Sequence, residues 1–269
     1  MTNLNDLLFD VKMVDFQEQF GIPANSDYKN AIIGTIDGQE KLLNACSDYY
    51  ELIPNSQIFP QINQNLNNAN INYSASYKSI NDARFYADYI IEDRAIQISK
   101  GDVIKPRIQI RHSYNGLTKY SIVFGYFRLI CTNGLVIPVE SENKFNLNIT
   151  GKHTKSINES FDKLLINLNI FTNEAQNIAK TFKVLAEKKV LNPEERLTEV
   201  MNQANIKKGQ DLILNTIRKE SAQLYGGTVN DWLIYNGINE YINNDQNNKK
   251  APEAREAIDQ KVLSFIMAS

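Results

Sequence analysis

The fold is decided by the stretch Arg107-Ile108-Gln109-Ile110-Arg111-His112-Ser113-Tyr114, which is followed by Asn115-Gly116 and by the mostly apolar run 119–130. Polar and apolar side chains alternate over residues 107–114, so one set faces a core and the other set faces away from it. Asn-Gly between two such runs is a strong signal for a hairpin whose two turn residues both take positive φ. These residues therefore predict an antiparallel sheet at the centre of the chain.

Strand and helix patterns continue on both sides of this hairpin. Residues 31–35, followed by Asp37-Gly38, indicate a strand and a turn, and the aromatic alternation over 73–98 indicates further strands. Residues 1–20 repeat apolar side chains at helical intervals, which favours a short amphipathic helical segment at the start of the chain. Further helices are expected over 56–66, 156–168, 172–190, 193 onward after the cap Asn192, 207–223, 231–241 and 252–266.

These patterns predict an α+β fold with a central antiparallel sheet, an acidic mixed N-terminal region and a helical C-terminal half. We expect residues 1–150 to form a mixed region that contains the sheet. Residues 151–269 are expected to form a helical region that packs on it, within one continuous domain.

Composition and the ends of the chain exclude several classes of protein. Of the 269 residues, 42% are hydrophobic and 22% are charged, which excludes wholesale disorder and coiled-coil architecture. No window reaches the roughly 18–20 apolar residues of a membrane span, so no membrane association is expected. The start Met1–Asp6 lacks the features of a secretory signal, which predicts a cytoplasmic protein. Two cysteines and two histidines without zinc-site spacing predict no metal and no other cofactor.

Charge is unevenly distributed along the chain. The net charge is −2, but residues 100–189 hold 14 Lys and Arg against 7 Asp and Glu, whereas residues 1–99 hold 6 against 13. A basic centre suits an anionic partner, because local fields guide association more than total charge does. A basic face that pairs with the protein's own acidic segment explains the same asymmetry, and both interpretations stay open.

Cations and aromatic residues are interleaved in the central strands. Single-stranded nucleic acid is commonly held by cationic grooves that follow the phosphates and by aromatic faces that stack on bases. We expect the cations to contact phosphate and Tyr120 or Tyr126 to stack, although aromatic side chains in a sheet more often belong to a core. The candidate nucleic-acid-binding residues are Lys105, Arg107, Arg111, Lys119, Tyr120, Tyr126 and Arg128.

No catalytic motif is present in the sequence. The phosphate-binding patterns GxxxxGK[ST] and GxGxxG and the nucleophile pattern GxSxG are all missing. Cys131 with His112 or His153 could form a nucleophile and base. However, Cys131 ends an apolar strand, where a buried thiol is common, and His112 has the apolar parity of its strand. The sequence favours a protein that is not an enzyme, and chemistry by scattered residues stays open.

The predicted helix 231–241 contains the sole tryptophan. Trp232, Tyr235 and Asn239 lie three and four residues apart and therefore share one face of the helix. This face is expected to dock on the sheet, and the alternative is that it joins subunits or caps a groove.

Three segments carry a resemblance to a known family. Residues 128–135, RLICTNGL, resemble the pattern R-x-x-C-x-N of a phage/plasmid-like family, the domain of unknown function 932. Residues 228–241 are similar to its pattern T-x6-Y-N-x3-E-Y, and residues 44–54 are similar to its early pattern Y-x-x-(I/V)-x-N. The resemblance spans roughly residues 30–245 and implies a protein of phages and mobile elements, of a family without an established activity.

Together, these observations predict a non-enzymatic phage or mobile-element protein in the host cytoplasm. It would be accessory to DNA replication or recombination and would bind single-stranded nucleic acid through its basic and aromatic sheet face. The alternative is a protein-interaction module, such as an anti-defence or assembly factor, with the acidic N-terminal 99 residues and the Trp232 face as its surfaces. Homo-oligomerisation is a further possibility.

Overall fold

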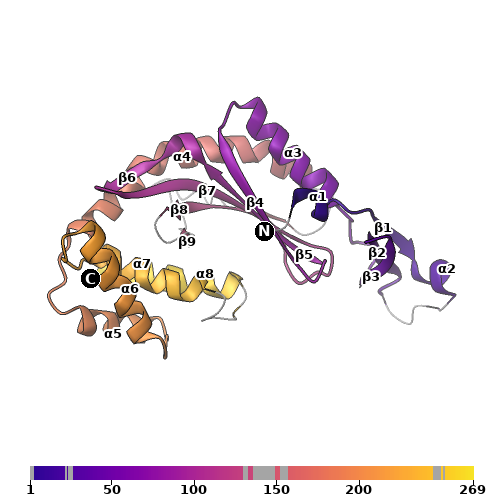
Figure 1. Cartoon of the computed structure of the whole chain (residues 1–269). Coiled ribbons are helices and arrows are strands. Elements are labelled where there is room, and N and C mark those ends of the chain that lie inside the picture. Colours follow the sequence, from indigo (N-terminus) through magenta and orange to yellow (C-terminus); the bar gives the residue numbers. More distant parts are fainter. Residues whose placement is uncertain are drawn as a thin grey trace. The chain divides into compact units, whose positions relative to one another are not determined.

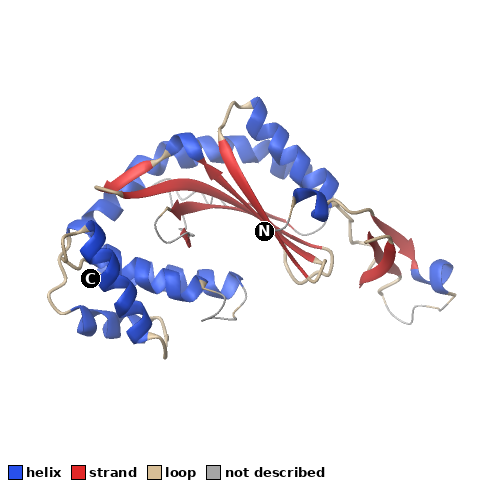
Figure 2. Ribbon diagram, viewed as in Figure 1, coloured by secondary structure: helices blue, strands red, loops and turns tan. Residues whose placement is uncertain are grey.

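A computed structural model describes residues 3–21, 23, 27–129, 133–135, 149–151, 157–244, 250 and 252–269 (Figures 1 and 2). The chain forms two compact units, each assembled from separate segments. Unit 1 comprises residues 1–93, 108–123 and 146–170, and unit 2 comprises residues 94–107, 124–145 and 171–269. The boundary predicted at residue 150 stays a prediction.

A small antiparallel sheet begins unit 1. It has the strand order β1-β2-β3, with β1 at Val11–Asp15, β2 at Asn30–Ile36 and β3 at Gln39–Cys46. The turn predicted at Asp37-Gly38 is present, and both residues have positive φ, 53° and 75°. The amphipathic helical segment expected over residues 1–20 is wrong as a continuous helix, because Leu4–Leu7 (α1) and Phe16–Phe20 (α2) are separate short helices. The segment between α1 and α2 forms β1, which pairs with β2. Helices as short as α1 and α2 gain little stability without tertiary packing.

A larger sheet contains the central hairpin. Its strand order is β10-β8-β7-β5-β4, and β6 and β9 pair with β7 and β8 respectively. The pairings β4–β5, β6–β7, β8–β9 and β8–β10 are antiparallel, which confirms the α+β prediction. A short 3₁₀ helix at Glu92–Arg94 follows β5. The strands are β4 (Tyr73–Ile80), β5 (Arg84–Ile91), β6 (Ile96–Ser99), β7 (Asp102–Ser113), β8 (Tyr120–Arg128), β9 (Asn133–Leu135) and β10 (Ile149–Gly151).

The connection between β7 and β8 differs from the predicted two-residue turn. It runs from residue 114 to residue 119, and within it Gly116 takes positive φ (71°) whereas Asn115 does not. The Asn115 side chain instead accepts a hydrogen bond from Leu117 N, at 3.1 Å. Ser113 Oγ donates to Thr118 O (2.7 Å) and accepts from Thr118 N (3.1 Å), which closes the longer loop. Side chains therefore make the bonds that a tight turn would make through its backbone.

Helix α3, Asn55–Asn68, covers one face of the sheet in unit 1 (Figure 1). Its side chains Ile58, Phe59, Ile62 and Leu66 are buried at helical spacing, as the predicted helix over 56–66 requires. The Phe59 ring lies 5.8 Å from the ring of Tyr77 on β4. This helix fixes which face of the sheet is the core face.

Helix α4 runs without a break from Ile157 to Glu187. The sequence predicted two helices there, 156–168 and 172–190. The prediction of a break is wrong because the apolar stripe continues through Leu164, Leu168 and Phe171, all buried, and no glycine or proline interrupts it.

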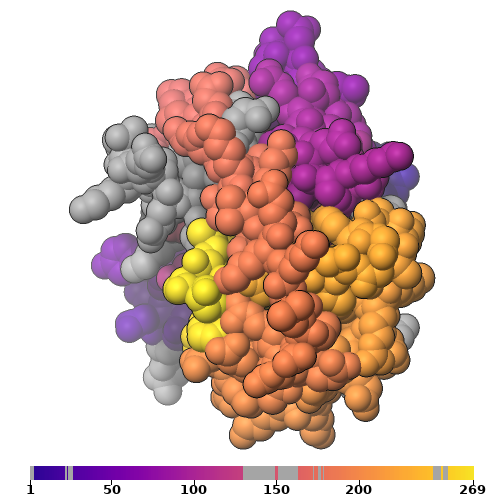
Figure 3. All heavy atoms as spheres, turned by 90° about the vertical axis from the view of Figure 1, so that its left-hand side faces the viewer, coloured from indigo at the N-terminus to yellow at the C-terminus, as the bar shows by residue number. Residues whose placement is uncertain are grey.

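The remaining helices gather in unit 2. They are α5 (Pro193–Gln203), α6 (Gln210–Leu224), α7 (Asp231–Asn243) and α8 (Pro252–Ala268), close to the predicted bounds. Asn230 caps α7 by accepting from Leu233 N at 2.9 Å. Residues 231–239 of α7 are all buried, and α7 packs against α6 and α8. Figure 3 shows the yellow atoms of α8 against the orange helices of this unit.

Candidate nucleic-acid interface

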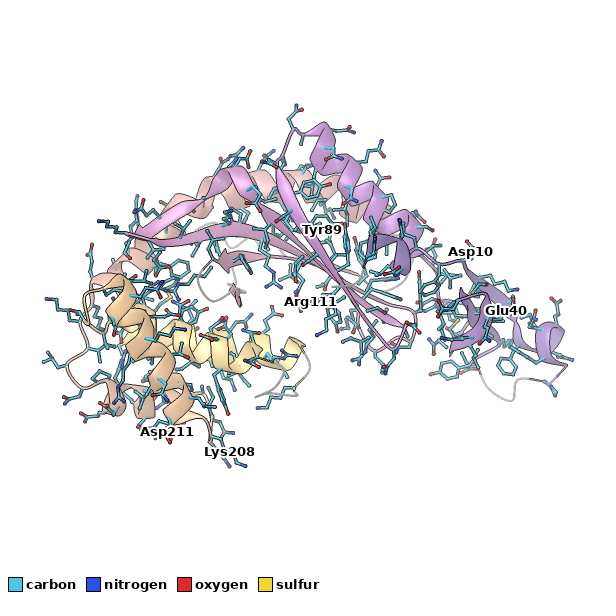
Figure 4. All side chains as sticks on the ribbon, viewed as in Figure 1. Asp10, Glu40, Tyr89, Arg111, Lys208 and Asp211 are labelled. Carbon is cyan, nitrogen blue, oxygen red and sulfur yellow. The ribbon has the colours of Figure 1, made fainter. Side chains whose placement is uncertain are left out.

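The sheet in unit 1 has an aromatic face that belongs to the core. His112 of β7 is fully buried, and its ring lies 6.1 Å from Phe85, 5.1 Å from Tyr114 and 6.4 Å from Tyr120. This confirms that His112 packs in the core, as its parity indicated. Tyr89 is also fully buried, on the side of the sheet that α3 covers (Figure 4).

The opposite face of the same strands carries polar residues. Residues that are directly paired in an antiparallel ladder share a face, and the register pairs Lys78 with Tyr86 and Ser76 with Asp88. Asp88 Oδ1 accepts a hydrogen bond from Gln109 Nε2 of β7 at 2.9 Å. Three neighbouring strands, β4, β5 and β7, therefore contribute side chains to one polar face, away from Tyr89.

Three cations are brought to this side of unit 1, and we call Lys78, Arg84 and Lys119 the cationic face. Arg84 lies two residues before Tyr86 in β5 and so shares its face. Thr118 Oγ1 lies 3.4 Å from Tyr86 Oη, which brings the preceding loop to the same place. Lys119 is exposed and directly follows Thr118 at the end of this loop, immediately before β8. Lys78 is exposed and Arg84 is half-buried.

Arg111, predicted to contact phosphate, lies behind this surface. Its residue is only 5% exposed, and its Nε donates to Gln109 Oε1 at 2.7 Å. Figure 4 shows the side chain on the opposite side of the sheet from Tyr89. The bonds from Arg111 to Gln109 and from Gln109 to Asp88 form a chain along the polar face. The prediction that Arg111 contacts phosphate at the surface is therefore corrected. Its side chain instead orders neighbouring side chains.

Lys105 and Arg107 belong to the part of β7 in unit 2. Both are half-buried and alternate with the buried residues Ile104, Pro106 and Ile108. The predicted alternation of β7 is thus confirmed, and phosphate contact by these two cations stays a prediction.

The two tyrosines predicted to stack on bases are internal. Tyr120 and Tyr126 are both 0% exposed. The Tyr126 ring packs 4.9 Å from Phe171 of α4, and burial raises the pKa of both phenols above the ordinary value. Stacking by either ring is wrong, because α4 and the aromatic core occupy the positions that a base would need.

Arg128, the last of the five cations predicted to contact phosphate, is the centre of a buried ionic network in unit 2. Its side chain is 0% exposed, and it makes two bonds to Asp102, from Nε to Oδ1 (2.8 Å) and from Nη2 to Oδ2 (2.6 Å). Its Nη1 donates to Glu220 Oε2 at 2.7 Å. Two carboxylates compensate the charge of this guanidinium inside the protein, so the prediction of a phosphate contact is wrong.

The same network includes two aromatic side chains. Trp232 Nε1 and Tyr225 Oη each donate to Asp102 Oδ2 at 2.9 Å. The Arg128 guanidinium lies 5.6 Å from the centre of the Trp232 ring, within range of a cation–π interaction. Desolvation and the neighbouring Asp102 raise the pKa of the Tyr225 phenol, so it stays a hydrogen-bond donor.

Two segments that carry the family resemblance therefore meet in space. Arg128 opens the first and Trp232 lies in the second, about a hundred residues along the chain. Trp232 is 0% exposed and lies 4.8 Å from the Phe182 ring. The docking prediction for this helix thus agrees with its burial, whereas a surface role for Trp232 is wrong. These residues stabilise unit 2 and do not form a contact surface.

The cysteines and His153 form no catalytic group within the described residues. Cys131 and His153 lie outside them, and Cys46 is buried, which together with Asp48 raises its thiol pKa. No three His, Cys, Asp or Glu residues are grouped to hold a metal ion in the part of the chain that the structure describes. None of the described helices combines the length and the apolar character needed to cross a membrane.

The sequence prediction missed Lys78 and Arg84. Both lie in the strand segment predicted over 73–98, but that prediction used only the aromatic residues of the segment. The signal that could have found them is parity, because each has the same parity as Tyr86 within its strand or strand pair. Parity also indicated that Arg128 points inward, because it has the same parity in β8 as Phe124 and Tyr126.

Comparison with known proteins identifies a family but no function. No curated protein and no solved structure matches this chain. The model of one family, described as Domain of unknown function (DUF932), matches residues 42–263. This match includes the sheet of the cationic face, the buried Arg128 network and helices α5 to α7. The chain therefore belongs to the DUF932 family.

Proposed function

We propose that the protein is a non-enzymatic nucleic-acid-binding protein that holds a single strand on the cationic face of unit 1. The observation that carries this proposal is the placement of Lys78, Arg84 and Lys119 on the side of the sheet opposite its aromatic core. Lys78 and Lys119 are exposed and Arg84 is half-buried, whereas Tyr86 and Arg111 of the same face are only 5% exposed. A single strand presents phosphates that such cations can follow.

The internal position of Tyr120 and Tyr126 changes the expected mode of binding. With these rings in the core, contacts to phosphate supply the affinity, and stacking by these two residues supplies none. Phosphate contacts carry no sequence information by themselves. We therefore expect weak, sequence-tolerant binding that depends strongly on salt. Lys105 and Arg107 of unit 2 are further candidate contacts.

The biological setting is proposed from the resemblance of the sequence motifs. A phage/plasmid-like family suggests an accessory role in replication or recombination of a mobile element, in the cytoplasm of its host. Single-stranded nucleic acid is an intermediate of both processes, which fits the proposed ligand.

Fluorescence anisotropy of a labelled, mixed-sequence single-stranded oligonucleotide tests this function. At low salt we expect saturable binding by the wild-type chain, and at least about tenfold weaker binding by Lys78→Gln/Arg84→Gln, since charge-assisted contacts are the stronger hydrogen bonds. Lys12→Gln is the matched control, because Lys12 is exposed but pairs with Glu40 at 2.6 Å on the small sheet. Failure of the wild-type chain to bind at low salt would refute the proposal.

A second candidate function, protein binding, is favoured by the apolar surface near the small sheet. Exposed side chains there include Leu42 (56%), Tyr28 (58%) and Tyr49 (90%). Leu42 lies within β3, and Tyr28 and Tyr49 lie just outside β2 and β3 in the sequence; exposed apolar groups that form a patch often mark interaction sites. A partner complex that resists nuclease and is lost in Leu42→Ser/Tyr49→Ser would support this function, and a complex that nuclease dissolves would contradict it.

A further inference from the structure

A cavity of about 400 Å³ in unit 2 combines three lysines with an aromatic ring. We propose that it binds a mononucleotide-type ligand, in which a phosphate ester is attached to a planar ring. The cations are Lys207, Lys208 and Lys250, and the ring is that of Tyr241. The volume lies within the range of small-molecule sites. This site is separate from the cationic face and does not depend on its function.

The two adjacent lysines project from a backbone segment of defined conformation. Just after α5, Asn205 lies in the left-handed region (φ 55°). Ile206 N donates to Met201 O at 2.8 Å, and Asn205 N donates to Asn202 O at 3.1 Å. This bond pattern is a Schellman motif. Gly209, with φ 93°, is then the N-cap of α6. Lys207 and Lys208 are thus held between two fixed helix ends.

The guanidinium of Arg255 anchors the part of the cavity wall that contains Lys250. Arg255 of α8 donates from Nε to Lys250 O (2.8 Å) and from Nη1 to Asn243 O (3.1 Å). These bonds join the backbone at residue 250 to the end of α7, next to Tyr241 and Ile242. The third lysine therefore belongs to a wall with its own anchoring contacts.

The remaining lining suits a planar ring. The side chains of Ile206, Ile242 and Ile258 line the cavity together with half-buried Tyr241. The Tyr241 ring lies against Gly209 so closely that a Cβ at that position would come within 2.2 Å of it. This contact restrains the ring, and a restrained aromatic ring beside aliphatic side chains can hold a base by stacking and apolar contact.

The charges of the cavity select an anion. Its described lining residues include three ammonium groups and no carboxylate. Gly209 gives α6 no side-chain cap. The partial positive charge at the N-terminus of this helix therefore adds to the positive charge of the lysines. Asp211 lies in the first turn of α6, near Lys208 in Figure 4, but does not line the cavity. A phosphate at the lysines and a ring at Tyr241 would use both halves of the site.

Calorimetric titration of the full chain with AMP, inorganic phosphate and adenosine tests the proposal. We expect AMP to bind at least about tenfold more tightly than phosphate or adenosine, because only AMP engages both halves. Lys207→Gln/Lys208→Gln should weaken AMP binding at least about tenfold, by loss of charge-assisted bonds. Lys183→Gln, which removes an exposed lysine of α4, and Lys78→Gln/Arg84→Gln should leave AMP binding unchanged.

Three results would overturn the proposal. They are no heat of binding with AMP, phosphate that binds as tightly as AMP, and full affinity in the variant that lacks Lys207 and Lys208. Loss of AMP binding in Lys78→Gln/Arg84→Gln would assign the nucleotide to the cationic face instead. Because oligonucleotide binding is measured separately, failure of one site is distinguishable from failure of the other.

Discussion

At the scale of the residue, Arg128 shows how strongly burial determines the role of a charge. Its guanidinium is shared between Asp102 and Glu220 in the interior of unit 2. Removal of one partner leaves buried charges without compensation, which costs about 3–5 kcal/mol. We therefore expect Arg128→Met to lower the free energy of unfolding by about that amount in urea denaturation.

An exposed ion pair provides the control for this variant. Arg218 pairs with Glu194, and both side chains are more than half exposed. Solvent screens such exposed pairs, so Arg218→Met should change the unfolding free energy little. Equal losses in the two variants would contradict the account of the Arg128 network.

Asp259 gives unit 2 a stability that depends on pH. This buried carboxyl of α8 accepts bonds from Tyr235 Oη (3.0 Å) and Asn239 Nδ2 (2.7 Å). Burial raises its pKa from 3.8 to about 7, and the two bonds only partly oppose the shift. Between these values the folded state binds more protons than the unfolded state, so stability falls as pH rises. The loss through this window is up to about 4 kcal/mol.

Urea denaturation at pH 5 and pH 8 measures this effect. Asp259→Asn keeps the size of the side chain and cannot ionise, so its stability should change less between the two pH values than that of the wild-type chain. A wild-type protein that becomes more stable over this range, in step with the variant, would show that Asp259 is not the titrating group.

At the scale of the element, Gly237 sets the approach of α6 and α7. A Cβ at this position would come within 2.7 Å of Ile217 Cγ1 and 3.3 Å of Ile213 Cγ2. Alanine favours a helix by about 1 kcal/mol over glycine, but overpacking costs about 1–3 kcal/mol. Because the nearest atom adjoins Cβ and is not a flexible end, we expect Gly237→Ala to lower the melting temperature.

A double-variant cycle separates this contact from general damage. Ile217→Ala removes the atom that the new methyl group would meet, so the two substitutions should cost less together than the sum of their separate effects. Strict additivity would show that the helices do not meet at Gly237.

Elements with strong local signals were predictable, whereas elements made by pairing were not. Alternation identified β7, and caps at Asn192 and Asn230 marked the starts of α5 and α7. Strand β1 was missed because its pairing with β2 overrides a helical spacing. The long connection after Ser113 was missed because its hydrogen bonds come from side chains.

The candidate site was predictable only in part for the same reason. Alternation separates two faces of a strand, but it does not say which charged residues have a carboxylate partner inside. Glu220 lies 92 positions after Arg128, and this distance hid the pair from sequence analysis. Lys78 and Arg84 became candidates only when the register of β4 and β5 placed them beside Tyr86.

At the scale of the whole molecule, the excess of basic residues over 100–189 divides into internal and external charges. Arg128 and Arg111 are buried, whereas Lys119, Lys163, Lys180 and Lys183 are exposed. The count of cations in the sequence therefore overstates the charge that a partner meets. Nucleic-acid binding must depend on the exposed cations, and the number of these cations that contact phosphate can be measured.

The dependence of oligonucleotide affinity on salt is the most direct test of the cationic face. Each phosphate neutralised on a single strand contributes a slope of about −0.7 to log K against log salt. Contacts by Lys78, Arg84 and Lys119 therefore predict a slope of about −2, and Lys78→Gln/Arg84→Gln should reduce its magnitude by about 1.4. Affinity that does not change with salt, or a slope that is the same in both proteins, would contradict the account.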